Sequence, residues 1–191
     1  MTSDHLTIAG MAGALLCGAA YAATWLSPQF LWLASFGLLV NWFGDSLDGS
    51  LARVRQQERP RYGFFIDYTA DVLSQIFIFF GLGASPYLHF DMACLAIISY
   101  WMASLFTLIR TVATEVFQLS FFGIGPTEIR IGLIAYNFLL LGFGEWSLET
   151  RFGKVSLLDG IMVVIFVAVF VTFLAMRRAE GQRLAAEDAR R

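Results

Sequence analysis

Six long apolar stretches constrain this chain more than any other feature of its sequence. They lie at about residues 6–26, 29–52, 63–84, 88–114, 127–144 and 156–176. A helix that crosses a bilayer needs about 20 mostly apolar residues. The chain is 58% hydrophobic, whereas soluble domains are about 45–50% apolar. The sequence therefore predicts an all-α, polytopic membrane protein with six transmembrane helices, formed as a single domain over residues 1–191.

The first stretch ends in CGAAYAA, which could also be a signal-peptide cleavage region. The preceding MTSDH contains no Lys or Arg, whereas a signal peptide starts with a positively charged region. We therefore expect this stretch to remain in the protein as a membrane helix. Cys17 and Cys94 lie in apolar stretches and are expected to be core residues, not a disulfide or a metal site.

The basic residues predict the orientation of the helices, because cytoplasmic loops carry an excess of Lys and Arg. If the six stretches alternate in direction, ten arginines fall on one side of the membrane: Arg53, Arg55, Arg59, Arg61, Arg130, Arg177, Arg178, Arg183, Arg190 and Arg191. Arg151 and Lys154 fall on the other side, and Arg110 lies within the fourth stretch. We expect both termini to be cytoplasmic, with residues 178–191 as a cytoplasmic tail.

Four aspartates interrupt the second and third stretches near their cytoplasmic ends. Asp45 and Asp48 are three residues apart, and Asp67 and Asp71 are four apart, so each pair shares one face of a helix. Residues 54–62 join the two helices as antiparallel neighbours. The four carboxylates are therefore expected to converge in a polar cavity that faces the cytoplasm.

Such a group of carboxylates needs compensation, because one ionised Asp at the centre of a membrane helix costs about 2.5–3.5 kcal/mol. Divalent cations supply it, since hard cations take carboxylate oxygens as ligands. The alternative is that the aspartates pair with Arg53, Arg55 or Arg61 near the membrane surface. Four carboxylates at this spacing, with glycines between them, favour the cation site.

Small residues and one arginine complete the predicted site. Gly49 and Gly63 lie beside the aspartates, and a residue without a side chain lets a ligand approach the backbone closely. Ala52 keeps the facing surface small, and Arg53 offers a planar cation suited to phosphate. The sequence therefore predicts a metal-binding slot with a phosphate-binding group.

The full pattern is D-x2-D-G-x2-A-R-x9-G-x3-D-x3-D over residues 45–71. It resembles the signature of the CDP-alcohol phosphotransferase family, which consists of six-helix membrane enzymes, and all eight fixed positions match. The resemblance implies an enzyme of phospholipid synthesis that moves a phospho-alcohol group from a CDP-linked donor to an acceptor hydroxyl and releases CMP. It also implies two divalent ions, Mg²⁺ or Mn²⁺, a homodimer in the lipid bilayer, and no nucleic-acid partner.

The resemblance also implies roles for the matching residues. Asp45, Asp48, Asp67 and Asp71 would bind the metal ions, and Asp71 would also take the proton of the acceptor as a general base. The cytidine and phosphates of the donor would lie against five residues of the motif: Asp48, Gly49, Ala52, Arg53 and Gly63.

Three weaker matches lie outside the full pattern or overlap its end, and two of them bear on the substrate. HLTIAG resembles the start of the family, although Asp4 stands where the family often has Asn. FGIGPTEIRIGLI and IDYTADVLSQIF resemble the choline and ethanolamine phosphotransferase branch, although Tyr68 stands where that branch commonly has His. The last two matches lean towards CDP-choline or CDP-ethanolamine as donor and diacylglycerol as acceptor. The alternative is CDP-diacylglycerol with a small polar acceptor.

Arg110, Glu128 and Arg130 form a second group of ionisable residues at about the depth of the aspartates. An ionisable residue within a membrane is a candidate functional residue. Arg110 or Arg130 is expected either to bind a phosphorylated acceptor, such as glycerol phosphate or inositol phosphate, or to pair with Glu128 or Glu115 and join the fourth and fifth helices. The sequence leaves these alternatives open.

A cation transporter is the main alternative to an enzyme, because carboxylates can line an ion path. Such a path predicts acidic residues throughout the depth of the membrane, whereas the first and sixth stretches are almost uncharged apart from Asp159. A structural scaffold leaves the four aspartates unexplained. The sequence therefore favours the enzyme.

Overall fold

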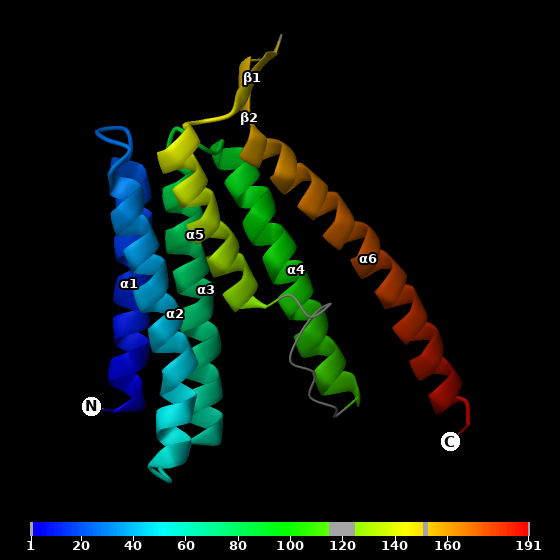
Figure 1. Ribbon diagram of the computed structural model, residues 1–191. Helices are drawn as coiled ribbons and strands as arrows, with labels where there is room; N and C mark the ends of the chain where they lie inside the picture. The colour runs from blue at the N-terminus through cyan, green and yellow to red at the C-terminus, as the bar shows by residue number, and fades with distance from the viewer. Residues whose placement is uncertain (1, 115–124, 151–152, 191) are drawn as a thin grey trace.

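The computed structural model describes residues 2–114, 125–150 and 153–190 (Figure 1). Within these residues the chain forms six helices and a two-stranded hairpin, namely α1 (Ser3–Ala23), α2 (Phe30–Val54), α3 (Pro60–Gly83), α4 (Phe90–Thr114), α5 (Pro126–Phe143), β1 (Ser147–Thr150), β2 (Gly153–Ser156) and α6 (Leu157–Asp188). Both termini and the connection between α2 and α3 lie at the same end of the molecule, the lower end in Figure 1.

The predicted all-α membrane fold is confirmed. Helices α1, α2, α3, α4 and α6 are long and apolar enough to cross a membrane, while α5 is shorter, with 18 residues. The first five helices begin and end within three residues of the predicted stretches. Helix α6 is longer than predicted, because it continues through the charged tail to Asp188. Ala, Glu, Gln and Arg predominate in that tail and are strong helix formers.

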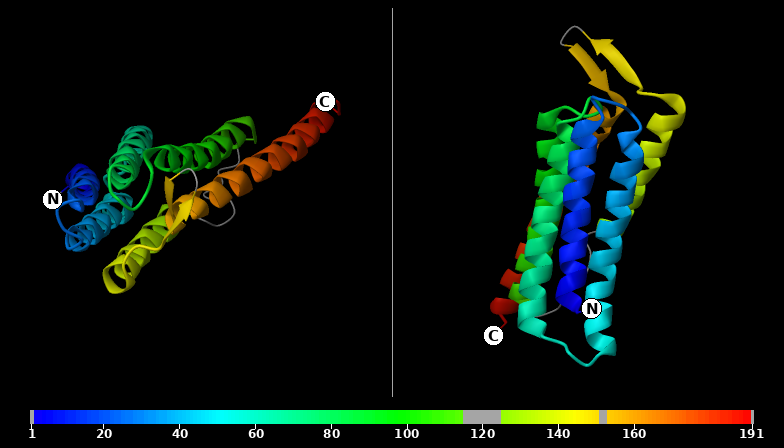
Figure 2. Two further views of the ribbon diagram at one scale, coloured as in Figure 1. Left: turned by 90° about the horizontal axis from the view of Figure 1, so that it is seen from above. Right: turned by 90° about the vertical axis from the view of Figure 1, so that its left-hand side faces the viewer.

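Helix α1 lies between α2 and α3, which touch each other only slightly (Figure 2). Glycines allow this close packing. A Cβ atom on Gly44 of α2 would lie 2.6 Å from the Cα of Gly10, and a Cβ on Gly81 of α3 would overlap the backbone of Gly18. Small residues let the backbones of membrane helices approach in this way. The sequence predicted α2 and α3 as direct neighbours, so α1 is an unexpected spacer between the two aspartate pairs.

Helix α5 packs against α2 in an antiparallel direction. At one end Trp32 meets Phe138 edge to face, with 5.2 Å between the ring centroids. Next to this ring pair the buried amide of Asn137 donates to the hydroxyl of Ser35 at 3.0 Å and accepts from Tyr21 of α1 at 3.0 Å. These contacts hold the second half of α5 beside the first third of α2.

Helix α6 packs on α4, and both diverge from the other helices towards the lower end (Figure 1). At the upper end Asp159 joins α6 to the connection before α4. Its carboxylate lies 2.8 Å from His89 Nδ1 and accepts from the backbone N–H groups of His89 and Ser156. The hairpin that precedes α6 pairs Ser147 with Ser156 and was not predicted from the sequence.

Candidate active site

The four aspartates lie at the end of the molecule where α2 ends and α3 begins. Asp45 and Asp48 are in the second half of α2, and Asp67 and Asp71 are in the first half of α3. The structure thus brings both pairs to the same end of the bundle, as the sequence predicted. The side chain of Asp48 is buried, while those of Asp45, Asp67 and Asp71 are half-buried.

Arg130 of α5 lies between two of these aspartates. Its Nη1 is 2.7 Å from Asp45 Oδ2, and its Nη2 is 3.8 Å from Asp71 Oδ1. The Arg130 side chain is only 8% exposed, against 24% for Asp45 and 27% for Asp71. Glu128 or Glu115 was one expected partner of this arginine, but Arg130 pairs instead with two residues of the aspartate motif. A contact between residues 85 positions apart leaves no local signal in the sequence.

Helix α1 holds Asp48 from the other side. The hydroxyl of Thr7 donates to Asp48 Oδ2 at 2.8 Å, and the hydroxyl of Ser3 donates to the backbone carbonyl of Asp48 at 3.0 Å. The second carboxylate oxygen of Asp48 accepts from the N–H of Gly49. Thr7 was missed as a site residue, although the weak match of HLTIAG to the start of the family was a signal for it.

Asp67 differs from the other three aspartates. No hydrogen bond or ion pair to its carboxylate occurs within residues 2–114, 125–150 and 153–190. Arg130 attracts its charge only at longer range, against the repulsion of Asp48 and Asp45. Of the four carboxylates, Asp67 is the one with both oxygens free to bind a ligand.

The four aspartates fit a divalent cation in chemistry but do not form a finished cage. Carboxylate oxygens are the ligands that hard divalent cations prefer. Across the described parts of the chain, however, no three acidic, histidine or cysteine side chains gather at the spacing of ligands around one ion. In this arrangement the cation in contact with Asp45 and Asp71 is the Arg130 guanidinium.

The predicted donor-binding residues border the aspartates. A Cβ atom on Gly49 or on Gly63 would meet no protein atom within 4 Å, so packing does not require glycine at either position. Arg53 is exposed and donates to the hydroxyl of Ser50 at 3.3 Å, and Ala52 is half-buried. The backbone at both glycines is thus open to a ligand.

The predicted acceptor residues do not all meet at this site. Arg130 lies at the site. Arg110 does not, because its Nε lies 3.2 Å from Glu180 Oε1 of α6, and this ion pair joins α4 to the charged end of α6. Glu128 Oε2 accepts from the N–H of Gly125 at 2.7 Å and so caps the start of α5. Glu115 lies outside the described residues.

An ion pair at the surface connects α1 to the segment between α2 and α3. The Arg59 guanidinium donates to Asp4, and this hydrogen bond raises the pKa of Arg59. The same guanidinium lies 4.3 Å from the ring centroid of Tyr62. Asp4, which stands where the family often has Asn, thus has a partner of its own in this chain.

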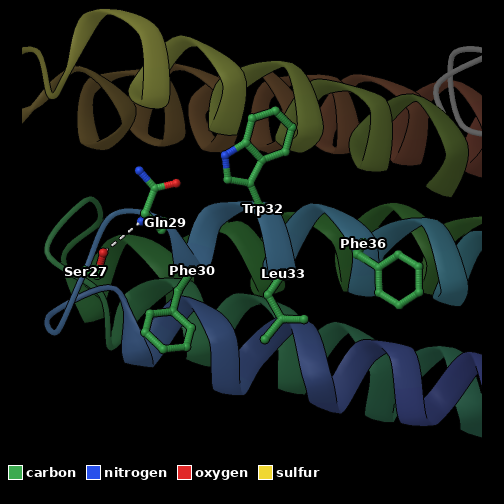
Figure 3. A pocket seen from close by; sticks show the side chains of 6 residues that line it. All are labelled: Ser27, Gln29, Phe30, Trp32, Leu33 and Phe36. Atoms are coloured by element: carbon green, nitrogen blue, oxygen red, sulfur yellow. Dashed lines mark hydrogen bonds between the residues drawn. The ribbon is translucent and has the colours of Figure 1, made fainter.

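A groove at the start of α2 is a separate feature. Figure 3 shows its lining residues, which are Ser27, Gln29, Phe30, Trp32, Leu33 and Phe36. The groove is almost entirely apolar and lies at the opposite end of α2 from the aspartates. None of these lining residues is charged, and the groove is not part of the candidate active site.

Comparison with known proteins identifies the family. The sequence model of the CDP-alcohol phosphatidyltransferases matches residues 2–174, nearly the whole chain. The chain belongs to the CDP-alcohol phosphatidyltransferase family. The predicted family is therefore confirmed. A curated relative, the archaetidylinositol phosphate synthase of Pyrococcus horikoshii, is 35% identical over 104 residues, which are 54% of this chain and 52% of the relative. The match thus spans about half the length of that relative.

Membership of the CDP-alcohol phosphatidyltransferase family supports a membrane transferase of phospholipid synthesis over the alternative of a cation transporter. Together with the five long apolar helices, it supports an integral, multi-pass membrane protein. The family implies a CDP-alcohol donor and an alcohol acceptor in a lipid environment, and it generally depends on divalent metal ions.

Proposed function

We propose that this protein transfers a phosphatidyl-type group from a CDP-linked lipid to a hydroxyl of a small phosphorylated polyol and releases CMP. The observation that carries the proposal is the ion pair of Arg130 with Asp45 and Asp71. Through this ion pair, a side chain that is suited to binding phosphate lies next to the eight-residue motif of the family. The relative named for archaetidylinositol phosphate supports an acceptor of this class.

The donor is proposed to lie against the motif residues between the two aspartate pairs. Gly49 and Gly63 leave the backbone open to the cytidine and its phosphates, with Ala52 and Asp48 beside them. Arg53 is exposed, so its guanidinium is free to turn from Ser50 to a phosphate of the donor. A planar guanidinium binds phosphate through two parallel hydrogen bonds.

The metal site is proposed to consist of Asp45, Asp48, Asp67 and Asp71, holding two Mg²⁺ or Mn²⁺ ions. When bound, such ions neutralise the pyrophosphate and the charge that develops on the leaving group. Thr7 fixes the orientation of Asp48, whereas Asp67 is free of other bonds within the described chain.

Asp71 is proposed to act as the general base as well as a ligand. It takes the proton of the acceptor hydroxyl as the acceptor oxygen bonds to the β-phosphorus of the donor. The bond from that phosphorus to the bridging oxygen breaks, and CMP leaves with the electron pair. Because the donor-binding residues belong to α2 and α3 and Arg130 belongs to α5, donor and acceptor can be held from different helices.

The excess of arginines at this end of the molecule supports a cytoplasmic active site and cytoplasmic termini. A homodimer is proposed from the family resemblance.

The choline and ethanolamine branch remains the second candidate, on the match of FGIGPTEIRIGLI. In this chain, however, Thr127 and Glu128 of that segment have structural contacts of their own. Thr127 accepts from the indole N–H of Trp42 at 3.3 Å, and Glu128 caps Gly125. Their presence therefore has a structural reason that is independent of the substrate.

The proposed function is tested by measuring CMP release from purified protein with Mg²⁺ and matched pairs of substrates. CDP-diacylglycerol is offered with inositol phosphate, glycerol phosphate or unphosphorylated inositol, and CDP-choline or CDP-ethanolamine is offered with diacylglycerol. We expect release with CDP-diacylglycerol and a phosphorylated polyol, and little release with unphosphorylated inositol. Release only from CDP-choline or CDP-ethanolamine would assign the chain to the second candidate.

Thr7 provides a sharper test of the proposed metal site. Thr7→Val keeps the shape of the side chain but removes the donor to Asp48, whereas Thr7→Ser keeps the donor. Loss of a residue that orients a metal ligand typically lowers metal affinity or activity by about 10–100-fold. We expect Thr7→Val to need that much more Mg²⁺ for half-maximal CMP release, and Thr7→Ser to restore the wild-type requirement. Equal requirements in all three proteins would remove Thr7 from the site.

A further inference from the structure

The Arg130 guanidinium is the most deeply buried member of its ion cluster. It is less exposed than either carboxylate that it contacts, and it comes from a different helix than either of them. A buried charge is costly unless it is paired. Arg130 and its two aspartates therefore stabilise one another in this arrangement.

The backbone of Arg130 is fixed independently of this ion pair. Thr127, one turn earlier, is bonded to Trp42, and Asn137, about two turns later, is bonded to Ser35. Helix α5 is thus held against α2 on both sides of Arg130. Movement of the guanidinium away from the aspartates would need rotation of its long side chain and no movement of the helix.

The other two aspartates are not engaged by Arg130. Asp48 is bonded to Thr7 and Gly49, and the carboxylate of Asp67 has no such bond in the described chain. A divalent ion can therefore approach from the side of Asp48 and Asp67. To bind Asp45 and Asp71 as well, the ion must take carboxylate oxygens that now face the Arg130 guanidinium. The ion and the guanidinium are both positively charged and therefore repel each other.

We propose that Arg130 is the built-in counter-ion of the aspartate cluster, and that divalent ions exchange with its guanidinium when they bind. This inference rests on the proposed metal site. The exchange couples two events, because the ion releases Arg130 from Asp45 and Asp71 as it binds. The released guanidinium is then available to an anionic group of the acceptor, so the acceptor binds after the metal.

The test compares thermal unfolding of purified wild-type protein and Arg130→Met, without substrates, in EDTA and over a Mg²⁺ titration. The variant is purified in Mg²⁺ and then stripped with EDTA. We expect Arg130→Met to melt below the wild type in EDTA, because its carboxylates lack a counter-ion, and to approach the wild type in saturating Mg²⁺. Coupled ligands typically change each other's affinity by about 5–150-fold. The variant should therefore be half-saturated at a Mg²⁺ concentration at least about fivefold lower than the wild type.

Arg110→Met is the matched control, since Arg110 is also paired with an acidic residue of another helix, Glu180. Its loss of stability should be the same with and without Mg²⁺. If the melting temperature of Arg130→Met stays as far below that of the wild type in Mg²⁺ as in EDTA, the proposed exchange is wrong. Failure of the variant to fold even with Mg²⁺ would also overturn it. The CMP-release assay tests the proposed function separately. Metal-dependent CMP release by the wild type, together with a melting temperature of Arg130→Met that Mg²⁺ does not restore, would reject the exchange and leave the proposed function intact.

Discussion

Asp67→Asn is expected to abolish metal-dependent CMP release while the protein still inserts and folds. The substitution preserves the size of the side chain and breaks no hydrogen bond or ion pair within the described residues. It removes a proposed metal ligand whose oxygens are both free. Loss of one group that stabilises transition-state charge typically costs about 10²–10³-fold in rate, and loss of a metal ion held by several such groups should cost more.

The measurement is CMP release at saturating donor and acceptor over a range of Mg²⁺ concentrations, with thermal unfolding as the check on folding. Asp91→Asn is a suitable control, because Asp91 is an exposed aspartate in the first turn of α4, at the other end of the molecule. Its rate should equal that of the wild type. A wild-type rate in Asp67→Asn would contradict the metal-site assignment. Asp48→Asn is expected to lose turnover as well, but its bonds to Thr7 and Gly49 make the result less direct.

Asp71→Asn should separate binding from chemistry. An amide cannot accept the proton of the acceptor hydroxyl, and a general base typically contributes about 10²–10⁴ in rate. Asp45, Asp48 and Asp67 remain to hold the ions, so CDP with Mg²⁺ should still raise the melting temperature of the variant. We therefore expect turnover to fall by at least about 10² while nucleotide binding persists.

Two other results would change the role of Asp71. Loss of binding together with turnover would make it chiefly a ligand. Survival of turnover would place the base elsewhere, and Glu128 would be the next residue to test, although its carboxylate now caps the first turn of α5.

The parts of the fold that were predicted correctly depend on local sequence. A membrane helix is recognised from the length of an apolar run, and the starts and ends of α1 to α5 followed from that property alone. The spacing of the aspartates along α2 and α3 likewise predicted which carboxylates share a helix face. The chemistry of these residues predicted a cation site and a phosphate-binding arginine, and the family resemblance added the reaction and the general-base role of Asp71.

The parts that were missed depend on contacts between distant residues. Glycine at position 10 or 44 does not reveal its partner, so the place of α1 between α2 and α3 could not be read from the sequence. The same holds for Thr7 with Asp48 and for Arg130 with Asp45. In each case the partner lies far away along the chain, and only the fold reveals which residues meet.

The length of α6 also bears on where the membrane ends. At about 1.5 Å per residue, its 32 residues extend for about 48 Å, whereas the hydrocarbon core of a bilayer is about 30 Å thick. The apolar part of α6 ends at Arg177, so the remaining turns project into the headgroup layer and water. Arg110 of α4 contacts Glu180 in this projecting part. The last turn of α4 therefore lies outside the hydrocarbon too. A water-soluble acceptor and the headgroup of a lipid donor would then meet at one level, without either having to leave its own solvent.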